Sequence, residues 1–129
     1  MNTTSRGFTV VEILIVVSVL VFASILFFVQ KNNLEVAARD EQRKTSINAM
    51  YFSLEEVYFK SNGHYPRTIN ETILPSVDPA LFNDTAGVKV GEASGEFRYE
   101  PTNCTDDKCL EYTLRSILEN EADYIKTQR

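Results

Sequence analysis

An apolar run over residues 8–29, with a single carboxylate near its start, restricts the fold of this chain more than any other feature. As an α-helix rising about 1.5 Å per residue, the run would be about 33 Å long, which matches a hydrocarbon layer of about 30 Å. Glu12 lies inside the run. An acidic side chain deep in a membrane helix costs on the order of 2.5–3.5 kcal/mol, somewhat less near a helix end. We therefore expect Glu12 to have a functional partner.

Two ordinary kinds of apolar segment fit this run less well. A secretory signal peptide has an apolar core of about 7–15 residues followed by a small-residue cleavage site. The run is longer than that, and residues 21–25 make a poor cleavage site. A plain signal anchor explains the length but neither Glu12 nor the Gly7-Phe8 junction before it. Arg6 favours a cytoplasmic N-terminus under the positive-inside rule, with the bulk of the chain outside the cytoplasmic membrane.

The segment Ser-Arg-Gly-Phe-Thr-Val-Val-Glu-Ile-Leu-Ile, residues 5–15, resembles the N-terminus of type IV pilins and of the pseudopilins of type II secretion and competence systems. That family has a short basic leader, a glycine before the cut, a methylated phenylalanine as first mature residue and a glutamate as the fifth. The resemblance implies a leader over residues 1–7, cleavage between Gly7 and Phe8 by a prepilin peptidase, and methylation of Phe8. It also implies that Glu12 pairs with the Phe8 amine of an adjacent subunit.

A single long helix is predicted for residues 8–62, because no glycine or proline lies between Gly7 and Gly63. Residues 8–29 form its apolar half and residues 30–62 its amphipathic half. At i,i+4 spacing, Glu35/Arg39, Asp40/Lys44 and Glu56/Lys60 predict ion pairs on a solvated face. A stripe at spacings of three and four is expected to face the core: Leu34, Ala37 or Ala38, Ile47, Met50, Tyr51, Leu54, Val57 and Tyr58.

The Gly-His-Tyr-Pro run at residues 63–66 again resembles pilins and pseudopilins. Gly63 is the expected left-handed cap of the helix, and Tyr65 is expected to fold back on the apolar stripe. Within the connecting segment, residues 68–84, Asp78 and Pro79 predict the start of a short helical turn.

Period-two alternation predicts three strands, at residues 88–90, 97–99 and 110–114, with turns at 91–95 and 101–107. We therefore expect an α+β fold in which the long N-terminal helix packs on a small antiparallel sheet of about three strands, as in pilins. Residues 63–129 would form the globular head. The tail from Ser116 is compatible with a last strand, a short helix or a partly free end.

Cys104 and Cys109 are separated by four residues, which is too many for a thioredoxin-like motif. They predict a structural disulfide across a turn, and a shorter loop than the pilin family usually closes. Asp106 and Asp107, with Asp84, are weak calcium candidates, because their spacing matches no complete set of oxygen ligands. The only histidine, His64, is expected to be a turn or surface residue.

The sequence argues against an enzyme, since it shows no nucleophile–base–orienter set and no phosphate-binding glycine loop. The net charge of −5 argues against a general nucleic-acid binder. No cofactor is expected. The resemblance implies a structural subunit of a type IV pilus or pilus-like filament, held in the cytoplasmic membrane before assembly and in an extracellular filament or periplasmic pseudopilus afterwards. Its partners would be other copies of itself, the peptidase and an inner-membrane assembly platform.

Two alternatives remain open from the sequence. One is a pseudopilin or minor pilin of a secretion or competence system, where contact with DNA would be indirect. The other is a plain membrane-anchored binding module.

Overall fold

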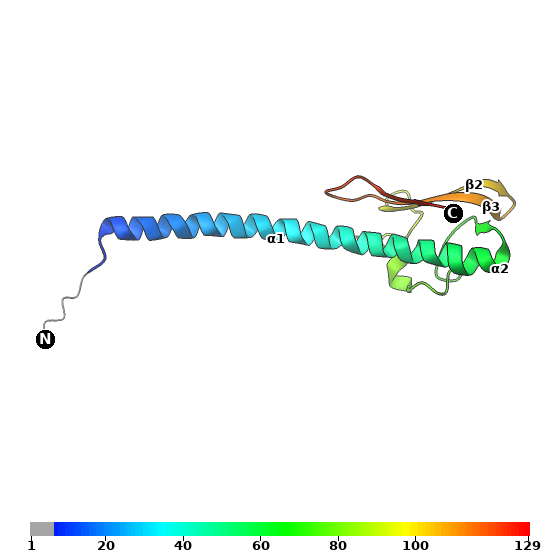
Figure 1. Ribbon diagram of the computed structural model, residues 1–129, viewed down its shortest axis with the longest axis horizontal. Coiled ribbons are helices and arrows are strands. Elements are labelled where there is room, and N and C mark those ends of the chain that lie inside the picture. Colours follow the sequence, from blue (N-terminus) through cyan, green and yellow to red (C-terminus); the bar gives the residue numbers. More distant parts are fainter. Residues whose placement is uncertain (1–6) are drawn as a thin grey trace. The chain divides into compact units, whose positions relative to one another are not determined.

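The structure is a computed structural model in which residues 7–129 are described; the rest of the predicted leader lies outside the described residues. Helix α1 (Val10–Phe52) leads directly into the π-helical segment η1 (Ser53–Phe59) and the short helix α2 (Lys60–Asn62) (Figure 1). Gly63 ends the helix in the left-handed region with φ of 71°. The predicted helix and its glycine cap are confirmed, although the helical residues begin at Val10.

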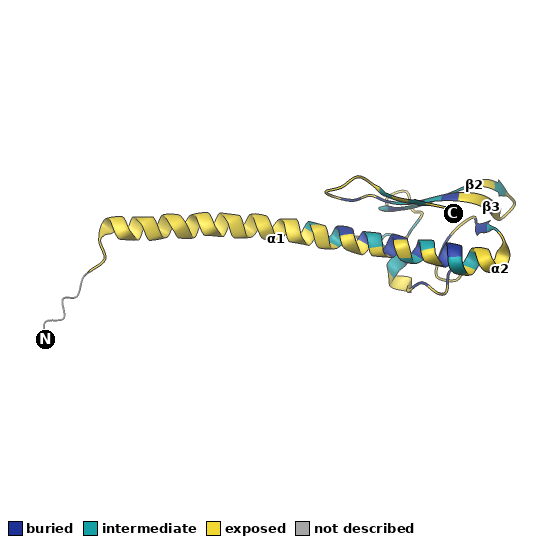
Figure 2. Cartoon of the chain, viewed as in Figure 1, coloured by how far each residue is buried: buried dark blue, intermediate teal, exposed yellow. Residues whose placement is uncertain are grey.

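The chain divides into two compact units, the first reaching Glu35 and the second comprising Val36–Arg129, which we call the head. Every described residue up to Glu35 is exposed, whereas the later part of α1 carries buried positions (Figure 2). Hydrophobic side chains thus serve two purposes in this chain. Those of the head form its core, and those of residues 8–29 are covered by nothing within the described chain.

The core-facing stripe of α1 is shorter than predicted. Ile47, Met50 and Leu54 are fully buried, as expected. Leu34 is exposed, as are Ala37 and Ala38, because the buried face of α1 begins only at Asp40.

The π-helical segment η1 changes which positions face the sheet, since its hydrogen bonds link residue i to i+5 and widen the turn. Three successive residues, Ser53, Leu54 and Glu55, are buried there. Val57, which the α-helical spacing predicts to be buried, is exposed.

The sheet is antiparallel and has four strands: β1 (Tyr65–Pro66), β2 (Phe97–Thr105), β3 (Lys108–Ser116) and β4 (Tyr124–Thr127). β3 is central. It pairs with β2 along its whole length, from Phe97 opposite Ser116 to Thr105 opposite Lys108. β1 and β4 share its other edge. The tail after Ser116 therefore contributes a strand, one of the states that the sequence left open.

One predicted strand is absent, and one predicted turn is too long. Residues 88–90 form no strand, since only Lys89 makes an isolated bridge, to Asn83. The turn predicted over residues 101–107 shrinks to Asp106 and Asp107, because β2 continues through Pro101. A proline is tolerated there because β2 is an edge strand, where a backbone N–H is not required on the open side.

The buried face of β3 also differs from the prediction. Cys109 points into the core, and Leu110 is 66% exposed rather than buried.

The predicted short turn after Asp78 is confirmed. It is the 3-10 helix η2 (Pro79–Phe82), and the Asp78 carboxylate accepts the Ala80 N–H at 2.9 Å. The core comprises Ile47, Met50, Leu54, Tyr65, Ile69, Leu74, Val77, Phe82, Phe97, Cys109, Tyr112 and Leu114.

Candidate functional site

The predicted processing site lies in non-helical, exposed chain just before α1. Gly7 and Phe8 precede the helix, and the Phe8 side chain is 76% exposed. Gly7, Phe8, Thr9 and Glu12 together line an open depression at this end of the helix. A peptide bond in such a position is accessible to a peptidase.

Thr9 and Glu12 form a reciprocal cap at the start of α1. The Thr9 N–H donates to Glu12 Oε2 at 3.3 Å, and the Glu12 N–H donates to Thr9 Oγ1 at 3.2 Å. This is a capping box, in which the carboxylate satisfies one of the free amide groups that begin every helix. Within a single chain, the Glu12 carboxylate thus already has a partner.

The apolar half of the helix is exposed over its whole length within the described chain, including Phe22, Phe27 and Phe28, whose side chains face outward. Among the described residues, one helix, near the N-terminus, is therefore long and apolar enough to cross a membrane. So much apolar surface needs either lipid or other protein around it.

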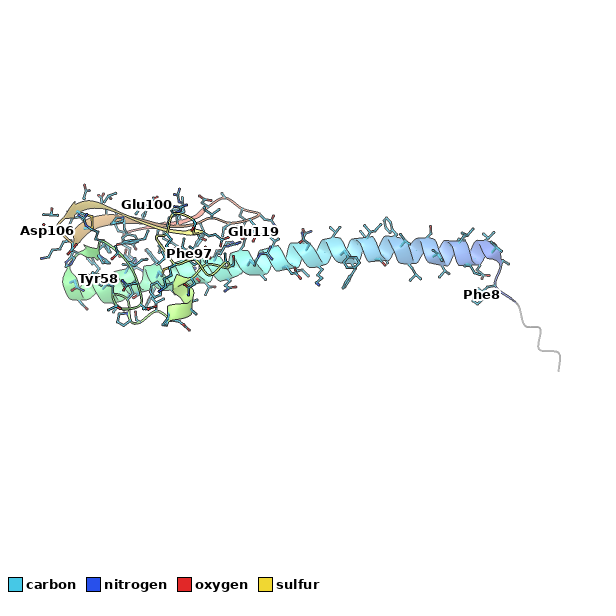
Figure 3. All side chains as sticks on the ribbon, turned by 180° about the vertical axis from the view of Figure 1, so that it is seen from behind. Phe8, Tyr58, Phe97, Glu100, Asp106 and Glu119 are labelled. Carbon is cyan, nitrogen blue, oxygen red and sulfur yellow. A yellow bond between two sulfur atoms is a disulfide. The ribbon has the colours of Figure 1, made fainter. Side chains whose placement is uncertain are left out.

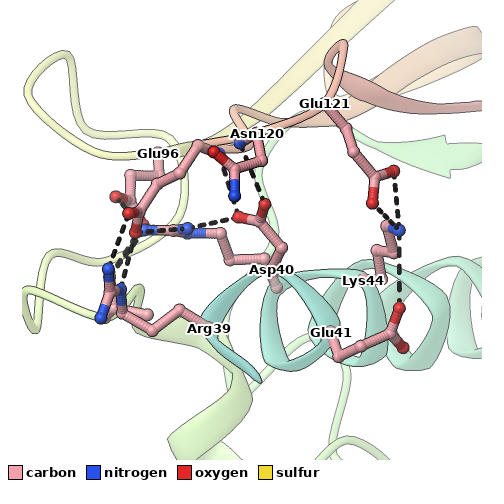
Figure 4. A network of polar contacts seen from close by, with 10 residues as sticks. Arg39, Asp40, Glu41, Lys44, Glu96, Asn120 and Glu121 are labelled. Carbon is pink, nitrogen blue, oxygen red and sulfur yellow. Dashed lines mark hydrogen bonds and ion pairs between the residues drawn. The ribbon is translucent and has the colours of Figure 1, made fainter. Parts of the chain in front are cut away.

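Within the head, a buried ionic network that the sequence did not predict joins α1 to the loops around the sheet (Figure 4). Asp40 and Arg43 are each 2% exposed, and their side chains pair at 2.7 Å. Arg43 also binds Glu96 through two nitrogens, at 2.7 and 2.8 Å, and Glu119 at 2.9 Å. Arg39 makes a two-pronged contact with Glu119, at 2.7 Å for both bonds.

The Asp40 carboxylate accepts hydrogen bonds from backbone amides as well as from Arg43. Its oxygens accept the backbone N–H groups of Glu119 at 3.0 Å and Asn120 at 3.2 Å. Burial alone would raise the pKa of Asp40, but these two amides and the Arg43 guanidinium hold it below its usual value. The predicted placement of Asp40 on a solvated face, paired with Lys44, is therefore wrong.

The pKa values of the other members of this network also shift in favour of the charged forms. Hydrogen bonds from Arg39, and then from Arg43, lower the pKa of Glu119 to about 2. Hydrogen bonding to Glu96 raises the pKa of Arg43 above its already high value. Lys44 binds Glu121 at 2.9 Å, and that contact raises the pKa of Lys44. Of the predicted i,i+4 pairs, Glu56–Lys60 is present.

Asp84 serves as a buried loop anchor. Its carboxylate accepts three backbone N–H groups, from Ala86 and Val88 at 2.9 Å and from Glu96 at 3.0 Å. Burial would raise the pKa of Asp84, but these three amides lower it. Both oxygens of this carboxylate are thus already used by donors of the chain itself.

The three weak calcium candidates do not come together. Asp106 lies at the tip of the β2–β3 hairpin, at the far end of the sheet from Glu119 (Figure 3), and Asp107 completes the same turn. Asp84 lies in the loop before β2. Among residues 7–129, no group of three or more histidine, cysteine, aspartate or glutamate side chains is placed to hold a metal ion.

Glu55 is a second buried carboxylate that the sequence did not single out. It is 6% exposed and accepts hydrogen bonds from the hydroxyls of Tyr65, at 3.1 Å, and Tyr112, at 2.8 Å. Burial, and then the nearby Glu55 charge, raise the pKa of Tyr65 to about 12. Tyr65 therefore does fold back on the helix, as predicted, and it does so onto a carboxylate in η1.

The structure contains the predicted disulfide between Cys104 and Cys109, which are directly opposed in the β2–β3 register. His64 lies in the turn after α2, where its Nδ1 is 2.9 Å from the Asn62 carbonyl oxygen and its ring meets Tyr58 edge-on. These contacts fit the expected turn residue.

Comparisons of the chain with protein-family models, with curated proteins and with solved structures found no match.

Sequence reasoning missed the Thr9–Glu12 cap and the Asp40–Arg43 network for different reasons. The first has a readable signal, because threonine followed three residues later by glutamate is a capping-box pattern. The second shows only the i,i+3 spacing of Asp40 and Arg43, because the partners Glu96 and Glu119 lie 53 and 80 residues away from Arg43 and Arg39.

Proposed function

We propose that this chain is a structural subunit of a type IV pilus or pilus-like filament, cut between Gly7 and Phe8, N-methylated at Phe8 and assembled through its N-terminal helix. One observation carries the proposal. An apolar helix with no cover from the described chain starts directly after an exposed Gly-Phe junction and holds a carboxylate in its first turn. A membrane can hold such a helix before assembly, and neighbouring helices can bury it in a filament. Burial of apolar surface is favourable by about 25 cal/mol per Å².

Glu12 has a specific part in this proposal. Its pairing with the Phe8 amine of an adjacent subunit brings together two charges that would each be costly alone in an apolar surrounding, and it sets the axial register of the subunits. In the single chain, the carboxylate holds the Thr9 N–H. On assembly, the Glu12 carboxylate would therefore bind the charged Phe8 amine of the neighbouring subunit in place of, or in addition to, the Thr9 N–H. The charged amine is the stronger hydrogen-bond donor.

The mass of the native N-terminus tests the processing step. We expect a chain that begins at Phe8 and carries one methyl group. Retention of residues 1–7 would contradict both the pilin and the pseudopilin assignments and would favour a plain membrane-anchored module.

Glu12→Val tests the assembly step, with Glu35→Gln as the matched control. Glu35 is also an exposed acid of the first unit, paired with Lys31 at 3.7 Å, but it lies outside the apolar run. We expect Glu12→Val to abolish filaments, as scored by electron microscopy of sheared cells, and Glu35→Gln to leave them intact. Normal filament yield and normal N-methylation in Glu12→Val would refute the role given to Glu12.

A further inference from the structure

Residues 119–129, which we call the strap, run alongside the helix and bind it in sequence order. The strap begins at Glu119 and Asn120, whose amides donate to Asp40. Further along, the strap contacts successive turns of the helix. Glu121 forms an ion pair with Lys44, Tyr124 a hydrogen bond with Asn48, Lys126 a cation–π contact with Tyr51, and Arg129 an ion pair with Glu56. The strap also contains β4, which pairs with β3 from Thr113 opposite Thr127 to Ser116 opposite Tyr124.

The two ends of the strap are held very differently. The start is tied to the buried carboxylate of Asp40, and the residue just before it, Leu118, is a buried hydrophobic side chain. Beyond Asn120, no residue of the strap is buried, and Ile125 is exposed. The start is therefore a fixed anchor, whereas the rest adds no fully buried side chain and only the partly buried Tyr124 packs against the core.

Beyond the anchor, the strap is held by the β3–β4 pairing, by the hydrogen bond from Tyr124 to Asn48 and by two ion pairs with the helix, and salt weakens the ion pairs. The Lys44–Glu121 and Arg129–Glu56 pairs each have one partner whose side chain is more than half exposed, at 57% and 66%. Exposed ion pairs contribute little and are screened as ionic strength rises. A four-residue edge strand held by such pairs belongs to the part of a protein that opens locally before the core does.

We infer that the strap beyond Asn120 is exchangeable between copies of this chain. When it opens, it uncovers the β3 edge at residues 113–116 and the helix positions at 44–56. The strap of a second copy presents the same side chains to the same edge. Every ion pair and ladder hydrogen bond that one copy gives up is therefore re-formed in the pair, which makes strand exchange inexpensive. Tyr124, the first residue of β4, follows Asn120 by four residues, so the Asn120 of one copy must lie within about 14 Å, at roughly 3.5 Å per residue, of the β3 edge of the other copy. This inference does not depend on how the N-terminus is processed.

Hydrogen exchange of the full unmodified chain in detergent tests the opening. We expect the amides of β4 to exchange about tenfold faster at 1 M than at 0.05 M NaCl, because salt screens the pairs that hold the strap, while those at the centre of β3 stay protected. Equal protection of β4 at both salt concentrations would overturn the inference.

Cysteine pairing tests the exchange itself. Thr113→Cys and Thr127→Cys are purified separately as full chains, mixed at high salt, returned to low salt and mildly oxidised with the native disulfide kept intact. Thr113 and Thr127 face each other across the β3–β4 register, so an exchanged strap yields a disulfide-linked heterodimer. Mass spectrometry of the linked peptides identifies it.

Glu111→Cys mixed with Thr127→Cys is the matched control for random collision, because Glu111 is an exposed β3 residue that does not pair with β4. We expect at least fivefold more heterodimer for the 113–127 mixture than for this control. Equal yields would overturn the inference. The double variant Thr113→Cys/Thr127→Cys, oxidised within one chain, locks the strap, and a locked chain should form no heterodimer with either single variant.

Discussion

At the scale of single residues, Arg43 is the side chain on which the attachment of the head's loops to α1 depends most. Its guanidinium is buried between Asp40, Glu96 and Glu119. We predict that Arg43→Ala lowers the free energy of unfolding by about 3–5 kcal/mol, because it leaves the buried Asp40 charge without its cation. Urea unfolding followed by circular dichroism measures the change.

Lys60→Ala is the control for this prediction. Lys60 pairs with Glu56, but its own side chain is 67% exposed. We expect a change below about 1 kcal/mol, since exposed pairs contribute little. Comparable losses for the two variants would mean that the burial of the Arg43 network has no energetic consequence.

Glu55 supports a second prediction at this scale. Glu55→Ala would leave the hydroxyls of Tyr65 and Tyr112 buried without their acceptor, and we expect a loss of about 2–4 kcal/mol. Tyr99→Phe is the comparison, because its hydroxyl donates to a neutral carbonyl, that of Pro66, at 2.7 Å. That variant should lose only about 0.5–1.5 kcal/mol. A larger loss for Tyr99→Phe than for Glu55→Ala would contradict the assignment.

Residues with local roles were predictable, whereas those with distant partners were not. Gly63 and Asp78 could be read from the sequence because a cap is decided within one turn of chain. Asp40 looks like any other acid of an amphipathic helix. It differs from them because it accepts hydrogen bonds from the backbone amides of residues 119 and 120, and these lie next to it only in the folded chain.

At the scale of elements, the β2–β3 hairpin with its disulfide supports a third prediction. Cys104→Ser/Cys109→Ser removes a link that closes a short loop, for which chain entropy gives about 2 kcal/mol. We expect a loss of that size in urea unfolding, with the sheet retained. A much larger loss, or loss of the β signal in circular dichroism, would show that the hairpin needs the bond in order to form.

The long elements followed from the sequence, and the irregular ones did not. β2 and β3 show the expected alternation over most of their length. Residues 88–90 alternate as well, but they find no neighbouring strand beyond one bridge to Asn83. The π-helical turn at 53–59 has no signature in the sequence, because it forms where Glu55 meets two tyrosines that arrive from β1 and β3.

At the scale of the whole head, carboxylates with lowered pKa values set the response to acid. Asp40, Glu56, Asp84 and Glu119 all have lowered pKa values in the folded head. A lowered pKa means that the unfolded chain binds protons more readily, so the stabilisation is complete above the ordinary pKa and is lost as pH falls. For Glu119 this window runs from 4.5 down to about 2.

We therefore predict that the urea midpoint is nearly constant from about pH 7 to about pH 5 and declines steadily below about pH 4.5. Asp84→Asn should flatten this decline, since an amide at that position no longer binds the extra proton on unfolding. A midpoint that stays constant down to about pH 2.5, or an unchanged slope in Asp84→Asn, would contradict the role given to these carboxylates.

The ionic network at Asp40 and Arg43 also has a mechanical consequence. A pull on residues 10–35 is transmitted along α1 and reaches the head at the turn that contains these two residues, which are the first buried positions of the helix. The load thus falls on short, directional bonds to separate segments of the head before it reaches the apolar core. Such bonds yield over a small displacement, so the head should tolerate high force with little stretching and then give way abruptly.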